Sequence, residues 1–351
     1  MKINPTVRKS LGFALKLTIA AAIVIYLFQR DQRGISECFR HFDYRYLIPA
    51  FLFYMAHIVV CAWRWRELAG ILGVRLTRLE ALSLTFQGYF FSLVIPGGAI
   101  GGDVVKMGAV TRRSADGVKV EGAFTVLMDR IVGMIALFVL ELAIIVPAIP
   151  ILMKVDIAGV KLNDHARILI IWLLVLLAVA GLLASSAVFF HRRIEQMPLF
   201  GTLMRRTDNI THGMVSRLTA ATDVYAASWR QLSLLTLGSI FFVHLMTVIP
   251  MFFLLSGLGV EYGFFDVIVA VTIGNIIGLI PLFPGGLGGR DAAAITLLAA
   301  SGIAPADAKT AQLIYTGILL LFSLSGSVFL VLDPQRAIDS GSREAPEDDR
   351  K

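Results

Sequence analysis

Hydrophobic residues in this chain come in long blocks, not in the one-sided stripes of a soluble amphipathic helix. A helix needs roughly 20 apolar residues to cross a bilayer core about 30 Å thick. Such runs are predicted to be helical because a helix satisfies its own backbone groups in lipid. The six predicted full spans are Leu11–Phe28, Leu47–Trp63, Ala123–Pro147, Ile168–Phe190, Leu232–Leu255 and Leu313–Leu332.

Two other apolar blocks are interrupted by proline and glycine. Ala81–Ile95 runs into Pro96-Gly97-Gly98-Ala99-Ile100-Gly101-Gly102-Asp103. Phe264–Ile280 runs towards Pro284-Gly285-Gly286-Leu287-Gly288-Gly289-Arg290-Asp291, and the short apolar block Ala292–Ala300 follows. Proline breaks a helix, and glycine allows positive φ and close backbone approach. We predict two re-entrant hairpins, although each break would also suit a tight loop between two thin spanning helices.

The distribution of basic residues predicts the orientation, because cytoplasmic loops carry excess lysine and arginine. The Arg-rich polar segment 191–230 and the segments 64–78 and 106–119 are expected in the cytoplasm, with the loops 151–167 and 256–265 outside. The outside loop 29–46 fits less well, because it holds four arginines. The two hairpins then enter from opposite sides, the pattern of an inverted-repeat transporter with its site between them.

The predicted organisation is all-α and polytopic, with a single transmembrane domain over residues 11–335. A cytoplasmic N-terminus, 1–10, precedes it and a disordered cytoplasmic tail, 336–351, follows it. The start of the chain resembles a signal peptide, but its apolar run is too long and ends without a small-x-small site. We therefore expect a retained first helix and a multi-pass protein of a bacterial-type inner membrane with both termini inside.

Composition agrees with a membrane protein. Of 351 residues, 57% are hydrophobic and 16% charged, against about 25% charged in soluble domains. The net charge of +7 is attributed to basic loops that meet anionic lipid head groups, so no nucleic-acid partner is expected. Cys38 and Cys61 have no metal or redox spacing, and a disulfide between them is not expected.

Charged residues near the breaks are the candidates for function, because charges within a membrane are costly. Lys106 lies one turn into the helix after the first break, and the adjacent Asp129 and Arg130 lie just inside a span. These two neighbours point to different faces, so they are not expected to pair with one another. The open alternatives are a snorkelling Arg130 and a structural Asp129. Glu141 lies deeper in the same span, whereas His57, Gln87, His244 and Asn275 are expected to be packing residues.

The start of each half-helix offers free N–H groups and a positive dipole, which suit an anion. Lys106, Arg130 and Arg290 would contact a phosphate, and Asp103, Asp129 and Asp291 would orient them or contact a cationic part of the head group. The whole candidate substrate site is Pro96, Gly97, Gly98, Gly101, Gly102, Asp103, Lys106, Asp129, Arg130, Glu141, Pro284, Gly285, Gly286, Gly288, Gly289, Arg290 and Asp291.

These motifs, with Gly133 after Asp129-Arg130, resemble the lysylphosphatidylglycerol synthase transmembrane-region family over about residues 10–335. The second motif ends in Arg290-Asp291 where the family more often has Arg-Glu, and Lys106 stands where arginine is frequent. The resemblance implies a flippase-like domain that moves lipids between leaflets, without naming the lipid. The aminoacyl-transferase domain of the bifunctional members is not recognisable after the last span, so no enzymatic activity is expected.

Three hypotheses follow. The first is a transporter for an anionic phospholipid, glycolipid or polyprenyl-phosphate lipid. The second is a membrane glycosyl- or phospho-transferase that uses Asp103, Asp129 or Glu141 as base or metal ligand. The third is a non-catalytic partner of a lipid-modifying enzyme, and a homo-oligomer is also open. No P-loop, His-Glu-x-x-His or Gly-x-Ser-x-Gly motif occurs, so neither a cofactor nor a metal is expected.

Overall fold

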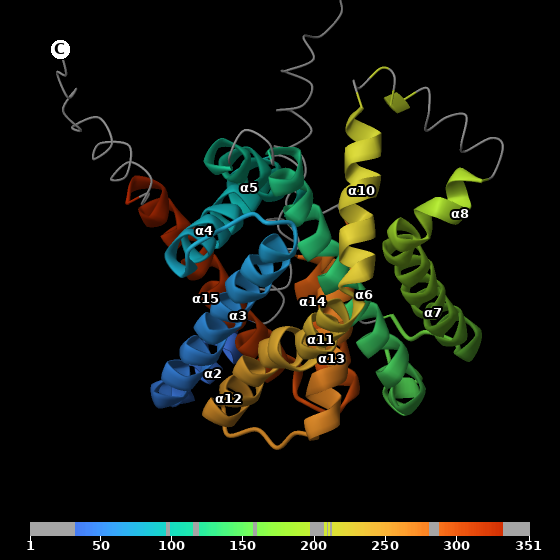
Figure 1. The fold of residues 1–351 in the computed structure, drawn as a ribbon. Helices are drawn as coiled ribbons and strands as arrows, with labels where there is room; N and C mark the ends of the chain where they lie inside the picture. Colours follow the sequence, from blue (N-terminus) through green and yellow to red (C-terminus); the bar gives the residue numbers. More distant parts are fainter. Residues whose placement is uncertain are drawn as a thin grey trace, which may run out of the picture.

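The computed structural model describes residues 32–95, 99–114, 119–156, 160–196, 207–208, 210, 213–280 and 288–332, and this part of the chain is helical (Figure 1). The α-helices are α2 Gln32–His41, α3 Leu47–Ile71, α4 Arg78–Val94, α5 Ala99–Arg113, α6 Lys119–Leu152, α7 Asp164–Ala187, α8 His191–Glu195, α10 Met214–Ala227, α11 Trp229–Ser239, α12 Ile249–Gly257, α13 Phe264–Gly278, α14 Gly289–Ala300 and α15 Pro305–Val331. Short turns are η1 Tyr44–Tyr46, η2 Val188–Phe190, the π-helical η3 Ile240–His244 and η4 Leu245–Thr247.

Five continuous helical stretches within the described residues are long and apolar enough to cross a membrane. They are Tyr44–Ile71, Lys119–Leu152, Asp164–Arg193, Trp229–Gly257 and Pro305–Val331. These stretches coincide with five of the six predicted spans, and the first, Leu11–Phe28, lies outside the described residues. The protein is an all-α polytopic membrane protein.

Several helices extend beyond the ends of the predicted spans. The helix that starts at Leu47 continues past Trp63 to Ile71, and the α6 helix extends through Pro147 to Leu152. The extension of α3 carries Arg64 and Trp65, which bind side chains of α6, and the extension of α6 crosses two prolines that would be expected to end a helix. The stretch Trp229–Gly257 is interrupted by the π-helical and 3₁₀ turns of η3 and η4, which the hydrophobic pattern also did not indicate.

The two interrupted blocks form two pairs of short helices, α4 with α5 and α13 with α14. At 1.5 Å per residue, their 17, 15, 15 and 12 residues reach about 26, 23, 23 and 18 Å, all short of a bilayer core of about 30 Å. Figure 1 shows α4 and α5 in the upper half of the bundle and α13 in the lower half. The connections, residues 96–98 and 281–287, lie outside the described residues.

Glycines let the two arms of each pair touch. A side chain at Gly102 of α5 would overlap the Gly88 carbonyl oxygen and the Ser92 hydroxyl of α4. In the other pair, a Cβ at Gly274 of α13 would lie 3.2 Å from the Arg290 carbonyl oxygen of α14. Small residues at such crossings are typical of helices packed in membranes.

Two positions in the first break need correction. Gly101 and Gly102 were predicted within the interruption, but both lie in the first turn of α5, which already starts at Ala99. Their small size allows α5 to pack closely on α4 and on the residue that follows it. A Cβ at Gly101 would clash with the Ile95 side chain. In the second break Gly288 has φ of +86°, as predicted for a glycine that ends an interruption.

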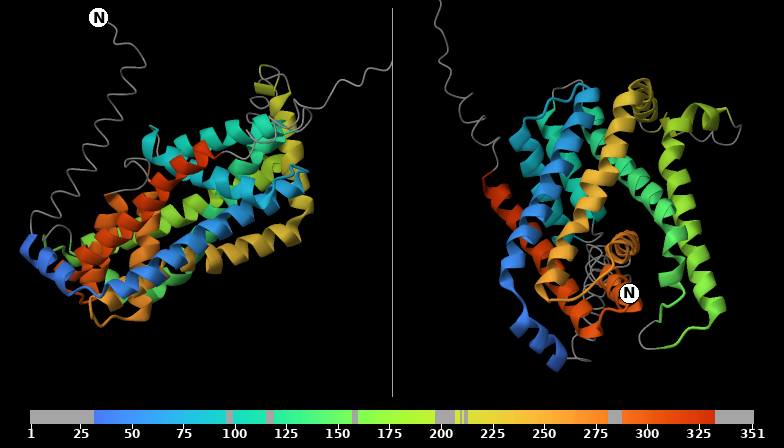
Figure 2. Two further views of the ribbon diagram at one scale, coloured as in Figure 1. Left: turned by 90° about the vertical axis from the view of Figure 1, so that its left-hand side faces the viewer. Right: turned by 90° about the horizontal axis from the view of Figure 1, so that it is seen from below.

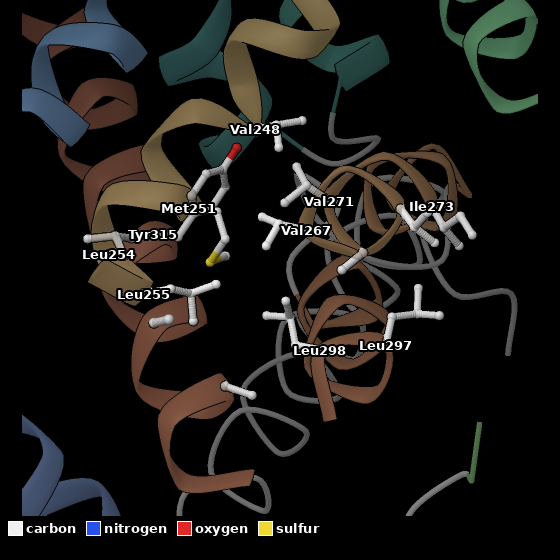
Figure 3. Close-up of a cluster of buried hydrophobic side chains, with 14 of the residues drawn as sticks. Val248, Met251, Leu254, Leu255, Val267, Val271, Ile273, Leu297, Leu298 and Tyr315 are labelled. Carbon is white, nitrogen blue, oxygen red and sulfur yellow. The ribbon is translucent and has the colours of Figure 1, made fainter. Parts of the chain in front are cut away.

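The largest cluster of buried apolar side chains joins the second pair to the long helices (Figure 3). Met251 and Leu255 of α12 face Val267 of α13 and Leu298 of α14, with Tyr315 of α15 at the same level. α15 then continues to the first pair, where the absence of a side chain at Gly326 lets it touch the Phe86 carbonyl of α4. α15 therefore packs on both pairs, with α14 near its start and α4 near its end.

α7 lies at the edge of the molecule and packs chiefly on α6 (Figures 1 and 2). The connection between these helices is closed by Asp156, which accepts hydrogen bonds from the Leu162 N–H at 3.1 Å and the Arg167 Nη2 at 2.9 Å. These two donors lower the pKa of the Asp156 carboxyl from its usual value, because both stabilise its charged form.

Candidate functional site

The charged side chains inside the bundle gather in two clusters. The α5–α6 cluster consists of Arg64, Asp103, Lys106, Asp129 and Arg130. The α14–α15 cluster consists of Arg290, Asp291, Gln312 and Thr316. Each cluster involves the helix that follows one of the two breaks, and Arg290, expected to share one phosphate with Lys106 and Arg130, lies in the other cluster.

Asp129 and Arg130 take different partners, as predicted. Arg130 makes a two-pronged contact with Asp103 of α5, with Nε–Oδ2 at 2.6 Å and Nη2–Oδ1 at 2.9 Å. The side chain of Arg130 remains 46% exposed in this pair, and that of Asp103 is 15% exposed. The guanidinium therefore reaches the surface of the bundle while it is held by an acid from the helix after the first break.

Asp129 pairs instead with Arg64 of α3, which is not among the predicted site residues. The Arg64 Nε lies 2.9 Å from Asp129 Oδ1, and its Nη1 donates to the Ser239 hydroxyl at 3.1 Å. Arg64 is only 6% exposed. Gly133, one turn beyond Asp129, makes room, since a Cβ there would lie 3.3 Å from the Arg64 guanidinium.

The run Trp63-Arg64-Trp65-Arg66 has the aromatic and basic composition of an interfacial anchor, but its two middle residues face the inside of the bundle. Trp63 is 51% exposed, but Trp65 is fully buried and donates from Nε1 to the Thr125 hydroxyl at 3.0 Å. Adjacent residues of a helix point in different directions, so one motif supplies both an outer and an inner face. One feature of the sequence pointed towards Arg64. Asp129 lies within a membrane span and cannot pair with its neighbour Arg130, so it requires a basic partner from another helix.

Lys106 is the charged residue of this cluster without an ionic partner. Its Nζ lies 3.7 Å from the centroid of the Trp65 ring, a cation–π contact, and the residue is 7% exposed. Among the described residues no carboxylate lies within 4.0 Å of this ammonium and none accepts a hydrogen bond from it. Asp103 and Asp129 are both engaged by arginines, so a buried positive charge remains for an anion to match.

The α14–α15 cluster is closed on itself. Asp291 Oδ1 receives hydrogen bonds from Arg290 Nη2 at 2.8 Å, Gln312 at 2.8 Å and Thr316 at 2.9 Å. Its other oxygen accepts from the Gly288 N–H at 2.9 Å and so caps α14. Arg290 is buried and also donates to Thr316, so its charge is already matched by protein groups.

The irregular turns η3 and η4 connect the two clusters. His57 Nδ1 lies 3.1 Å from the Val243 carbonyl oxygen, and His244 Nε2 lies 2.9 Å from that of Gly133. Tyr315 donates to the Thr247 carbonyl at 3.1 Å and Asn275 to the Thr247 hydroxyl at 3.2 Å. The two histidines and Asn275 are thus hydrogen-bonded packing residues, as predicted, and Gln87 likewise donates to Ser83 and the Phe329 carbonyl.

Glu141 joins neither cluster. It is 0% exposed, and neither carboxyl oxygen has a hydrogen-bond partner among the described residues. Of the other candidates, Pro96, Gly97, Gly98, Pro284, Gly285 and Gly286 lie outside the described residues. Within the described part, no group of three or more His, Cys, Asp or Glu side chains could hold a metal ion.

The sequence that forms these elements matches a known protein family. The family described as "Lysylphosphatidylglycerol synthase TM region" matches residues 13–326, which include α3 to α14 and most of α15. The chain belongs to this family. Its similarity extends to the UPF0104 membrane protein PH1989 of Pyrococcus horikoshii, which is 22% identical over 275 residues. That alignment covers 78% of this chain and 82% of the relative. The match to the family contains both helix pairs and both charged clusters, in agreement with the resemblance noted in the glycine motifs.

Proposed function

We propose that the protein is a lipid transporter that moves an anionic phospholipid, glycolipid or polyprenyl-phosphate lipid between the leaflets of the membrane. The observation that carries this proposal is Lys106, a buried ammonium over Trp65 whose neighbouring acids are already paired with arginines. A phosphate supplies the charge that this position lacks.

The half-exposed Arg130 lies close to Lys106 along α5, because the Arg130 guanidinium is bound by Asp103, three residues before Lys106. A head group that reaches this cluster would meet Arg130 first and Lys106 second. The acyl chains would stay in the bilayer while the head group crosses. The family membership and the membrane-spanning helices support this assignment to lipid transport.

The two helix pairs are proposed to be re-entrant hairpins related as an inverted repeat. Their helices are too short to cross a full bilayer core, and glycines bring the arms of each pair together. With the predicted orientation, α4 and α5 enter from the cytoplasm and α13 and α14 from outside an inner membrane. The α14–α15 cluster, in which Asp291 holds Arg290, would be the closed counterpart of the α5–α6 cluster.

Leaflet exchange in reconstituted vesicles tests the proposal. Lys106→Gln removes the unmatched ammonium, and Arg130→Gln removes the half-exposed guanidinium. We expect both variants to lose most of the exchange of a labelled anionic phospholipid that the unaltered protein supports, because an anion would lose its counter-charge. Lys154→Gln is the matched control, since Lys154 is exposed beyond the end of α6.

The folded state of each variant is checked by its thermal transition and by its elution as a single species in detergent. Wild-type exchange in both Lys106→Gln and Arg130→Gln would show that this cluster is not the head-group site. Absence of exchange by the unaltered protein above that of protein-free vesicles, for each of the three lipid classes, would overturn the transporter assignment itself.

A further inference from the structure

Glu141 is a fully buried carboxyl group without a hydrogen-bond partner in the described part of the chain. It is residue 23 of the 34-residue helix α6, about 17 Å along the helix from the end at Leu152. It is fully buried, and neither Oε1 nor Oε2 has a hydrogen-bond partner among the described residues. An ionised carboxylate is very unfavourable in such a place, so the side chain is a neutral acid that carries a proton.

Close packing keeps this place dry. One turn before Glu141, the Phe138 ring fills the position that a side chain of Gly181 on α7 would occupy. The helices α6 and α7 run antiparallel here, which brings the fully buried Ala178 near the level of Glu141. Leu140, Ile144 and Ile145 belong to the main apolar core.

The ionisable groups on the helices around α6 do not neutralise Glu141. Arg64 pairs with Asp129, and His57 and His244 contact backbone carbonyls. On α5, Asp103 pairs with Arg130 and Lys106 lies over Trp65. Arg290 and Asp291 bind one another on α14, whereas α7, α11 and α13 carry their charges in the first turn. Among the described residues, none of these groups forms a hydrogen bond with Glu141.

Glu141 and Arg130 of the α5–α6 cluster share one face of α6. Eleven residues, about three turns, separate Arg130 from Glu141, so the two side chains leave α6 in nearly the same direction. Between Glu141 and the outer end of α6, Pro147 and Pro150 each remove a backbone hydrogen bond. A movement of α6 that opens the α5–α6 cluster would therefore also move Glu141 relative to its dry surroundings.

We propose that Glu141 is a proton-binding site that couples lipid movement to the proton gradient across the membrane. This inference rests on the proposed function. A proton from one aqueous side binds a carboxylate oxygen of Glu141 while the site is open to that side. The neutral acid is then occluded, as in the described structure, and the proton leaves from the same oxygen when the site opens to the other side. Arg130 and Lys106 hold the head group during the same movement.

Glu141→Gln tests the coupling, because glutamine has the shape of the neutral acid and cannot exchange a proton. In vesicles with an imposed pH gradient, the unaltered protein is expected to accumulate labelled anionic lipid in one leaflet and to move protons when lipid is present. Glu141→Gln should lose both signals to the level of protein-free vesicles. Glu261→Gln, at an exposed position, is the matched control and should behave as the unaltered protein.

Infrared spectroscopy at neutral pH gives a readout that needs no transport. The unaltered protein should show the C=O stretch of a protonated carboxyl group that is missing from Glu141→Gln and present in Glu261→Gln. Identical carboxyl bands in all three proteins would overturn proton binding at Glu141.

The two proposals fail differently. Two results would overturn the coupling and leave the transporter assignment standing. One is lipid exchange by the unaltered protein that does not respond to the pH gradient. The other is gradient-driven lipid accumulation that persists in Glu141→Gln. Absence of any lipid exchange by the unaltered protein would overturn the transporter assignment and, with it, the coupling.

Discussion

Arg64 and Arg130 are matched by acids from other helices, whereas Arg290 pairs with its neighbour Asp291, and such pairs decide how single residues contribute to stability. Arg64 of α3 and Asp129 of α6 are 65 positions apart in the chain, and their side chains are 8% and 13% exposed. Loss of one member of a buried pair leaves an uncompensated charge, which typically destabilises a protein by about 3–5 kcal/mol. Exposed pairs contribute about 0–1 kcal/mol.

We therefore expect Arg64→Ala and Asp129→Ala each to destabilise the protein by about 3–5 kcal/mol. The double variant should be less destabilised than the sum of the two single ones, because it leaves neither charge alone. Thermal unfolding in detergent measures all three. Arg45→Ala, at a 92% exposed side chain, is the control and should change stability by no more than about 1 kcal/mol. Additive single effects would contradict a direct pairing.

At the scale of elements, the first helix pair is shaped by glycines of different kinds. Gly102 lies against α4, where a Cβ would overlap the Ser92 hydroxyl and the Gly88 carbonyl oxygen. Gly108 lies on the same helix, α5, and a Cβ there would have no neighbouring atom within 4 Å. The first glycine is required by close approach, whereas the second only weakens the helix.

Alanine at these two positions should therefore act in opposite directions. Gly102→Ala should force α4 and α5 apart and destabilise the protein by about 1–3 kcal/mol, the usual effect of overpacking. Gly108→Ala should be neutral or stabilise it by up to about 1 kcal/mol, because alanine favours a helix more than glycine does. Thermal unfolding of the two variants side by side decides the matter. Equal transitions would show that α4 and α5 do not touch at Gly102.

At the scale of the whole molecule, the helices leave basic and acidic groups at both ends of the bundle. On the side predicted to be cytoplasmic, Arg192 pairs with Asp223 and Arg217 with Glu121. On the other side, Asp156 and Arg167 close the connection of α6 to α7. The excess of basic residues near the first of these ends is what predicts the orientation.

Single cysteines introduced into a variant without Cys38 and Cys61 can test that orientation. Lys161→Cys should react with a membrane-impermeant maleimide in intact cells, because the loop between α6 and α7 faces outside in our prediction. Arg193→Cys, at the opposite end of α7, should react only after the membrane is permeabilised. The reverse pattern would show that the protein is inserted the other way round.

Much of the fold could be predicted because its signals are local. A run of apolar residues long enough to span a bilayer indicates a helix wherever it packs, as for Ile168–Phe190. A proline with glycines ends a helix by its own covalent structure, as between Ile95 and Ala99. The lengths of α3 and α6 and the π turn at Ile240 were not predictable in this way, because packing against neighbouring helices determines them.

For the candidate site, the sequence by itself indicated that charges lie within the membrane part and that Asp129 and Arg130 do not pair with one another, since the helix period sends neighbours in different directions. Only the tertiary structure decided that Arg64 takes Asp129, that Arg130 takes Asp103, and that Lys106 and Glu141 remain unmatched. The physical reason is that hydrophobic periodicity acts within one helix. The choice of an ionic partner depends on distances between helices that are far apart in the chain.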